Sequence, residues 1–322
     1  MKYKVGIIAA TLLLIGAWYV MSVRQGNVPS THSTDNKLMV ATSFYPLEFA
    51  LTRIIGDLEA VTNVGAGKDP HDFEPTVQNI LTMQKADLVV LQGADFEPWG
   101  DDVTARLEAD GVPVILATTD IALHEGGHHH DEDEPEEEHG DEYEEAEHNH
   151  GAYDPHTWLD PVLFSETVGY LTKEIANLDP ANAALYRENG RVLQAELAEL
   201  NTEYKNRLSN CELDEVITSH EAFGYLAERY NFAVHSIAGL STQDTPSIST
   251  LAELKTEAAE GISAILLEEN SVAAYGETLA RETGLVTLSV NPVEYLIPNG
   301  EDYFTLMRNN LDTFAAALKC HE

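Results

Sequence analysis

Positive charge is scarce in this chain. Its 322 residues include 18 Lys and Arg against 55 Asp and Glu, which gives a formal net charge of -37 at pH 7. A polyanion of this kind is repelled by nucleic acids and by anionic lipid surfaces, and it favours metal cations as partners. Nucleic-acid functions are therefore set aside. The hydrophobic fraction of 43% is ordinary for a globular protein, which argues against disorder throughout the chain.

Charge is absent altogether from residues 5–23, a mostly apolar run that follows Lys2 and Lys4. At helical rise this run spans about 28 Å, close to the thickness of a bilayer core. It is longer than the apolar part of a usual signal peptide, and no clear cleavage site follows it. We predict an uncleaved membrane anchor or signal segment over residues 1–26, with cleavage as the alternative, and a polar linker over 27–37. The positive-inside tendency places the remainder in the periplasm or at the outer face of the cytoplasmic membrane.

Cysteine is also scarce, because the chain contains only Cys211 and Cys320. Neither lies near the apolar run, so a lipidated cysteine is excluded there, and no thiolate is offered for a metal site. An even pair of cysteines in an exported protein favours a disulfide bond. Such a bond would tie the end of the chain to the start of its last third. Two unpaired cysteines are the alternative.

Short β-like runs alternate with helical patterns along most of the exported part. The eight runs are residues 38–43, 59–64, 87–91, 114–117, 215–219, 232–237, 264–267 and 286–290. This alternation predicts parallel sheets with helices on their faces. A helical pattern with few breakers covers residues 180–210, and about 28 helical residues would reach some 42 Å.

The fold class that follows is α/β, with two lobes joined by one long helix. We place the N-terminal lobe at residues 38–178, the linking helix at 179–210 and the C-terminal lobe at 211–322. One segment of the first lobe has almost nothing apolar to bury: residues 124–150 contain seven His and thirteen Asp or Glu. This composition predicts a disordered surface insertion.

The tripeptide Asp-Pro-His occurs twice, at residues 69–71 and 154–156. Proline fixes its own φ and pushes the preceding Asp towards extended geometry, so each histidine is held at the end of a stiff turn. Each turn comes just ahead of a helix predicted to begin with Pro75 or Pro161. Stiff placement suits a metal ligand, and two copies in matching contexts make His71 and His156 candidate ligands rather than surface histidines.

Two further candidates follow predicted strands. His220 comes directly after residues 215–219 and opens a predicted helix, so it lies at the carboxyl end of a parallel strand, where open α/β sheets bind their ligands. We expect its neighbour Glu221 to lie in the first turn of that helix, complementing the helix dipole. Glu294 is presented by a proline turn after the last run. Three imidazoles and one carboxylate suit Zn²⁺ in a closed site, although Mn²⁺, Ni²⁺ and Cu²⁺ accept the same ligand types.

Four motifs together resemble one protein family. They are DPHDFEPT at residues 69–76, DPHTWLDP at 154–161, SHEAFGYL at 219–226 and NPVE at 291–294. From about Leu38 to Leu318 the chain is similar to the metal-binding (cluster A-I) class of ABC-transporter solute-binding proteins, especially its zinc-specific branch. The resemblance implies two α/β lobes bridged by a rigid helix, with the ion in the cleft between them and a membrane permease as recipient.

Some details of the resemblance bear on the metal. Zinc members carry an acidic, His-rich loop before the second ligand, as residues 124–150 do here, and manganese members usually have a carboxylate at the position of His220. The resemblance therefore favours zinc, with manganese or another divalent metal as the alternative. Because the family often has Asp near the position of Asn291, the fourth ligand is left open among Glu294, Asn291 and a bound water.

The resulting prediction is a monomeric, extracytoplasmic zinc-binding component of an importer, which delivers zinc to an ABC permease and catalyses no reaction. The His-rich tract is either a loose collector of zinc or a merely solvated acidic loop. A zinc hydrolase using the same histidines, with Glu221 or Glu294 as base, is a second hypothesis. Catalytic zinc needs an exchangeable position, which four protein ligands would remove. A zinc buffer or adhesin is the third hypothesis.

Overall fold

The structure is a computed structural model, and it describes residues 38–56, 59–125, 153–259, 261–268, 273–295 and 300–321. The predicted anchor and linker, and residues 126–150 of the His-rich tract, lie outside these ranges. Within them, no helix is both long enough and apolar enough to cross a membrane.

The first sheet has four parallel strands in the order β2-β1-β3-β4. The strands are β1 (Leu38–Thr42), β2 (Glu59–Asn63), β3 (Leu88–Leu91) and β4 (Val114–Leu116). All four residues of β3 are buried, as expected for a parallel strand covered on both faces. The connecting helices are α2 (Tyr45–Ile55), α3 (Val77–Met83) and α4 (Gly100–Ala109).

The second sheet repeats this topology with four parallel strands in the order β6-β5-β7-β8. The strands are β5 (Glu215–Thr218), β6 (Ala233–Ser236), β7 (Ala264–Leu267) and β8 (Val286–Ser289). Its helices are α7 (Gly224–Tyr230), α8 (Ile248–Glu257), α9 (Ala273–Thr283) and α10 (Tyr303–Ala317). The strand order reverses between β5 and β7, and such a switch point is where open α/β sheets bind ligands.

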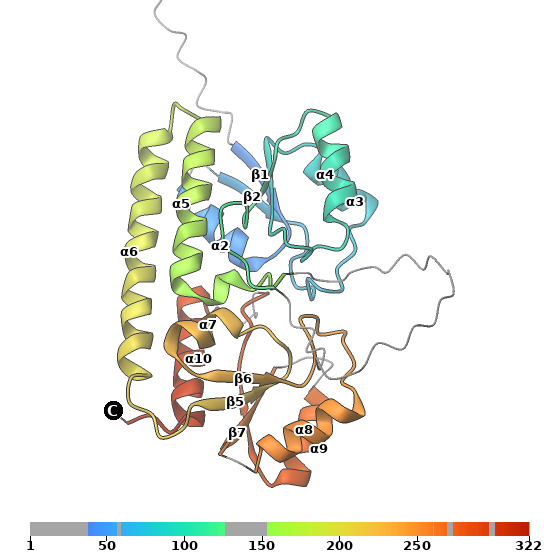
Figure 1. Cartoon of the computed structure of the whole chain (residues 1–322). Coiled ribbons are helices and arrows are strands. Elements are labelled where there is room, and N and C mark those ends of the chain that lie inside the picture. The colour runs from blue at the N-terminus through green and yellow to red at the C-terminus, as the bar shows by residue number, and fades with distance from the viewer. Residues whose placement is uncertain are drawn as a thin grey trace, which may run out of the picture. The chain divides into compact units, whose positions relative to one another are not determined.

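Two long helices connect the sheets. The helices α5 (Pro161–Leu178) and α6 (Ala183–Arg207) run side by side, and α6 also contacts α2 and α10 (Figure 1). The 25 residues of α6 reach about 37 Å, somewhat less than the sequence pattern predicted. The helix starts later than predicted because of the turn between α5 and α6, where Asp179 accepts hydrogen bonds from Asn182 and Tyr186, and it ends at Arg207. The predicted α/β fold with a long joining helix is confirmed.

The described residues, all from Leu38 onward, form one compact unit. Its largest buried cluster draws on both sheets and on the helices between them, and includes Phe44, Trp158, Phe223 and Tyr303. The predicted disulfide bond between Cys211 and Cys320 is present, so the residues that follow α6 and α10 are covalently joined. The predicted boundaries between the lobes stay a prediction.

Candidate metal centre

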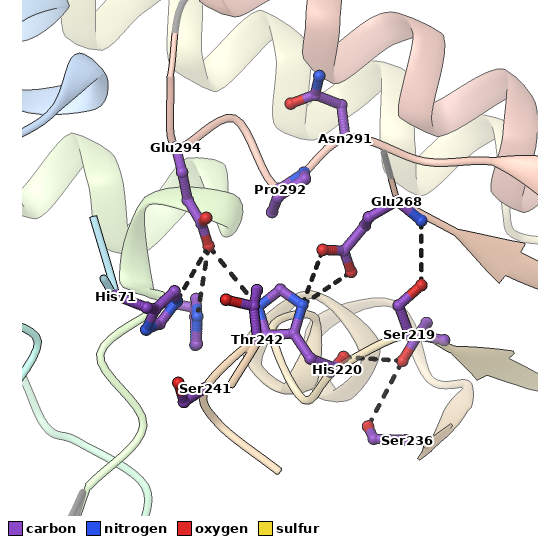
Figure 2. Close-up of polar contacts among 12 residues, drawn as sticks. His71, Ser219, His220, Ser236, Ser241, Thr242, Glu268, Asn291, Pro292 and Glu294 are labelled. Carbon is purple, nitrogen blue, oxygen red and sulfur yellow. Dashed lines mark hydrogen bonds and ion pairs between the residues drawn. The ribbon is translucent and has the colours of Figure 1, made fainter. Parts of the chain in front are cut away.

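The four predicted ligands lie together although they come from four separate loops. One potential ligand atom from each of His71, His156, His220 and Glu294 lies within 4.8 Å of the others. His156 and His220 are completely buried, and Glu294 is buried as well. Figure 2 shows the Glu294 carboxylate descending towards the imidazole rings of His71 and His220.

Glu294 Oε1 is the point on which the three imidazoles converge. It lies 3.3 Å from His71 Nε2, 3.7 Å from His156 Nε2 and 3.6 Å from His220 Nε2. A tetrahedral zinc ion with bonds of about 2.0 to 2.1 Å separates its ligand atoms by roughly 3.3 Å. These three separations from Glu294 Oε1 are within a few tenths of an ångström of that value, and every pair of ligand atoms in the group lies within 4.8 Å. The four side chains are therefore close enough together to surround one four-coordinate ion.

Two of these nitrogens have no hydrogen-bond partner despite complete burial, namely Nε2 of His156 and Nε2 of His220. The other nitrogen of each ring, Nδ1, lies 2.8 Å from a carboxylate, that of Asp154 for His156 and that of Glu268 for His220. A carboxylate accepts the proton on Nδ1 and leaves the Nε2 lone pair free for a metal. Buried polar atoms without partners are uncommon, and a bound cation would satisfy both.

The two Asp-Pro-His tripeptides form the same local turn. Asp69 Oδ1 accepts the backbone N–H of His71 at 3.0 Å, and Asp154 Oδ1 accepts that of His156 at 2.9 Å. The aspartates thus stiffen the turns together with the prolines. They differ in their further contacts, because Asp154 also reaches the ring of its own histidine, whereas Asp69 accepts a hydrogen bond from Thr242.

Glu294 follows a strained turn. Val293, a β-branched residue, has a φ of 59°, which is a rare conformation for such a side chain. Its N–H is held at 2.6 Å by Asn291 Oδ1, and Asn310 bonds both the backbone N–H and the carbonyl of Asn291. Asn291 therefore builds the turn that presents Glu294.

Two details of the predicted local structure are wrong. The helix after His220 begins at Gly224, so Glu221 does not lie in its first turn. The intervening residues form a turn in which Thr218 Oγ1 donates to the His220 carbonyl and the Glu221 N–H donates to Gly239. The helix expected to begin with Pro75 begins at Val77, because Thr76 caps it.

The group also has neighbours that the sequence did not reveal. The rings of Phe96 and Trp158 pack against His71 and His156 at centroid distances of 5.0 and 5.1 Å. Both aromatic residues are buried, so they exclude water from one side of the cluster. Glu268 was missed as well. A charged residue directly after the apolar run 264–267 was the signal that could have revealed it.

The buried charges shift the pKa values of the cluster in different directions. Burial lowers the pKa of His156, a shift that Asp154 only partly offsets. Burial acts in the same direction on His220, but the carboxylates of Glu268 and Glu294 raise its pKa well above the ordinary value. For Glu294, burial raises the pKa, whereas the nearby His71 and His220 bring it well below its usual range. Glu294 is therefore ionised at neutral pH.

Comparison with known proteins places these features in context. A model of the zinc-uptake complex component A family (ZnuA, periplasmic) matches residues 40–317. The high-affinity zinc uptake system protein ZnuA of Bacillus subtilis is 35% identical over 318 residues, which cover 95% of this chain and 97% of that protein. The zinc-binding protein AdcA of Streptococcus pyogenes serotype M3 is 32% identical over 322 residues, which cover 97% of this chain.

The match to AdcA covers only 61% of that relative, so this chain spans less than two thirds of its length. A solved structure is similar over the same region: the Zn(II)-bound ZnuA-like domain of AdcA from Streptococcus pneumoniae. It has a TM-score of 0.71 and 29% sequence identity, with 88% of this chain and 99% of that chain covered.

Proposed function

The chain belongs to the family of zinc-uptake complex component A proteins, and from this membership we propose that it is the extracytoplasmic zinc-binding component of an ABC-type importer. The proposal is supported by the relatives, which are named as zinc-binding and zinc-uptake proteins. A membrane permease would then be the recipient of the zinc. Attachment to the membrane through residues 5–23 and a monomeric state belong to the same proposal.

We propose His71, His156, His220 and Glu294 as the zinc ligands. The observation that carries this assignment is the pair of buried Nε2 atoms that lack a hydrogen-bond partner and lie 3.7 and 3.6 Å from Glu294 Oε1. Three neutral imidazoles and one carboxylate give a borderline cation such as Zn²⁺ its preferred donors. Asn291 is not proposed as a ligand because its side chain is engaged in its own turn.

Such a site suits capture rather than catalysis. Four protein ligands fill the tetrahedron, so no position stays open for a water that could attack a substrate. The family is one of solute-binding proteins, which agrees with a non-enzymatic role. Manganese is a weaker candidate, because it prefers oxygen donors to a set with three imidazoles.

Calorimetric titration of the purified protein with Zn²⁺ tests the proposal. We expect one tight site in the wild type and its loss in His71→Ala and in His156→Ala. His235→Ala is the matched control, because His235 pairs with Glu215 and Glu257 and not with the cluster. Wild-type affinity in both ligand variants would reject the assignment.

The importer role needs a separate test in cells. In the source organism, deleting the gene should slow growth only when zinc is scarce, and the wild-type gene should restore growth whereas His156→Ala should not. Normal growth and uptake of the deletion strain at limiting zinc would instead favour a zinc buffer or an adhesin.

A further inference from the structure

Glu268 lies at the switch point of the second sheet, one strand away from His220. The neighbouring strands β5 and β7 are in a register that pairs Thr218 with Leu266. Two residues further along each strand come His220 and Glu268, so the register brings them level at the carboxyl end of the sheet. The backbone N–H of Glu268 also donates to Ser219 Oγ at 3.0 Å, which joins the two strand ends.

The contact between the two side chains is close and buried. Both carboxylate oxygens of Glu268 lie 2.8 Å from His220 Nδ1, and the side chains are 1% and 0% exposed. Glu268 and Glu294 approach the imidazole from different sides, one at each nitrogen (Figure 2). A buried carboxylate is costly unless it has a charged or hydrogen-bonded partner. Glu268 is therefore placed where it can act on His220 and, through it, on a metal.

We propose that Glu268 is a positioning residue for zinc, which holds the His220 ring in the orientation and tautomer that direct Nε2 at the ion. The proposal rests on the proposed function and deepens it. Asp154 makes the corresponding contact with Nδ1 of His156. Among the described residues, no carboxylate is bonded to Nδ1 of His71, so the ligand set is asymmetric, with two rings oriented by carboxylates and one held through its loop.

Charge balance gives Glu268 a second effect. With three neutral imidazoles, a Zn²⁺ ion and the Glu294 carboxylate leave one positive charge in a buried site. Glu268 and Asp154 place two further carboxylates next to the ligand rings. Because electrostatic interactions are strong in a poorly solvated interior, these outer carboxylates stabilise the bound cation.

The central test compares zinc affinities, measured by competition with a chelating indicator, of the wild type and two variants. Glu268→Gln keeps the volume and a hydrogen-bond acceptor but removes the charge, and we expect zinc affinity to fall about 10-fold to 100-fold. Glu268→Asp keeps the charge but withdraws the carboxylate from Nδ1, and its affinity should fall as well. The matched control is Glu215→Gln, which removes a carboxylate from the Glu215–His235 pair on the same sheet and should leave zinc affinity unchanged.

The visible absorption of bound Co²⁺ separates positioning from general stability. A repositioned His220 changes the ligand field, so we expect the Co²⁺ spectrum of Glu268→Asp to differ from that of the wild type. Wild-type zinc affinity in Glu268→Gln, or in Glu268→Asp with an unaltered Co²⁺ spectrum, would overturn the inference. If Glu268→Gln does not fold, Glu268→Asp decides alone. Weak zinc binding by both the wild type and Glu215→Gln would instead reject the proposed function.

Discussion

Zinc binding is predicted to release a proton from His220 at neutral pH. In the metal-free protein this imidazole lies between the carboxylates of Glu268 and Glu294, 2.8 and 3.6 Å away. Burial alone would lower its pKa, but the two carboxylates raise it well above 6.5. His220 is therefore protonated at pH 7. A metal requires the lone pair of Nε2, so the ion must displace this proton.

One competing proton sets the magnitude of the effect. Below the raised pKa of His220, the apparent zinc affinity should fall about tenfold for each unit of pH. The decline starts above pH 6.5, which is higher than for an ordinary histidine. His156 has a lowered pKa, so its proton begins to compete only at more acidic pH, where the dependence should become steeper.

Calorimetry in buffers of different ionisation enthalpy counts the protons released, and chelator competition from pH 5.5 to 8.5 measures the affinity. We expect about one proton released per zinc at pH 7, and the same value for the control His235→Ala. Zinc affinity that stays constant between pH 8 and 6.5, with no proton released, would refute this account of His220.

The same histidine should give the metal-free protein the opposite pH dependence. A group whose pKa is raised on folding contributes stability that is complete below its unfolded pKa, about 6.5, and is lost as the pH rises through the folded value. The contribution of His220 should thus disappear over the range in which zinc affinity increases. Thermal unfolding in the presence of a chelator measures this, and a melting temperature that rises through the same range would contradict the argument.

Three further predictions concern stability. Replacing Cys211 and Cys320 by Ser together should lower the free energy of unfolding by about 4 to 5 kcal/mol, because the bond closes a loop with a sequence separation of 109; equal urea midpoints would contradict this. Free zinc at a thousand times its Kd should raise the free energy of unfolding by about 4 kcal/mol. An unchanged melting temperature on adding zinc would show that the folded protein has no tight zinc site. Trp158→Phe should cost about 1 to 3 kcal/mol in urea titrations, because it leaves the Pro292 carbonyl without its 2.8 Å hydrogen bond.

Some sequence predictions depend on residues outside the structure. The anchor over residues 5–23 and the zinc-collecting role of the tract at 124–150 stay predictions for that reason. Deleting the tract and measuring zinc uptake at limiting zinc would distinguish a collector from a solvated loop. For the fourth ligand, Glu294 and a bound water stay as the proposals, because the Asn291 side chain accepts the N–H of Val293 in the turn before Glu294.

The sequence by itself determined the α/β alternation, the long helix and the three histidines of the cluster, with Glu294 as one of the candidates for the fourth ligand. Each of these follows from a local sequence pattern, namely apolar runs of strand length, a helical period, and candidate ligands placed directly after turns or strand ends. Tertiary structure alone decided that Glu268 lies behind His220, since this follows from the register of β5 and β7, which are far apart in the sequence. It also decided which nitrogen of each buried ring faces Glu294. Both depend on contacts between distant segments, which no local pattern encodes.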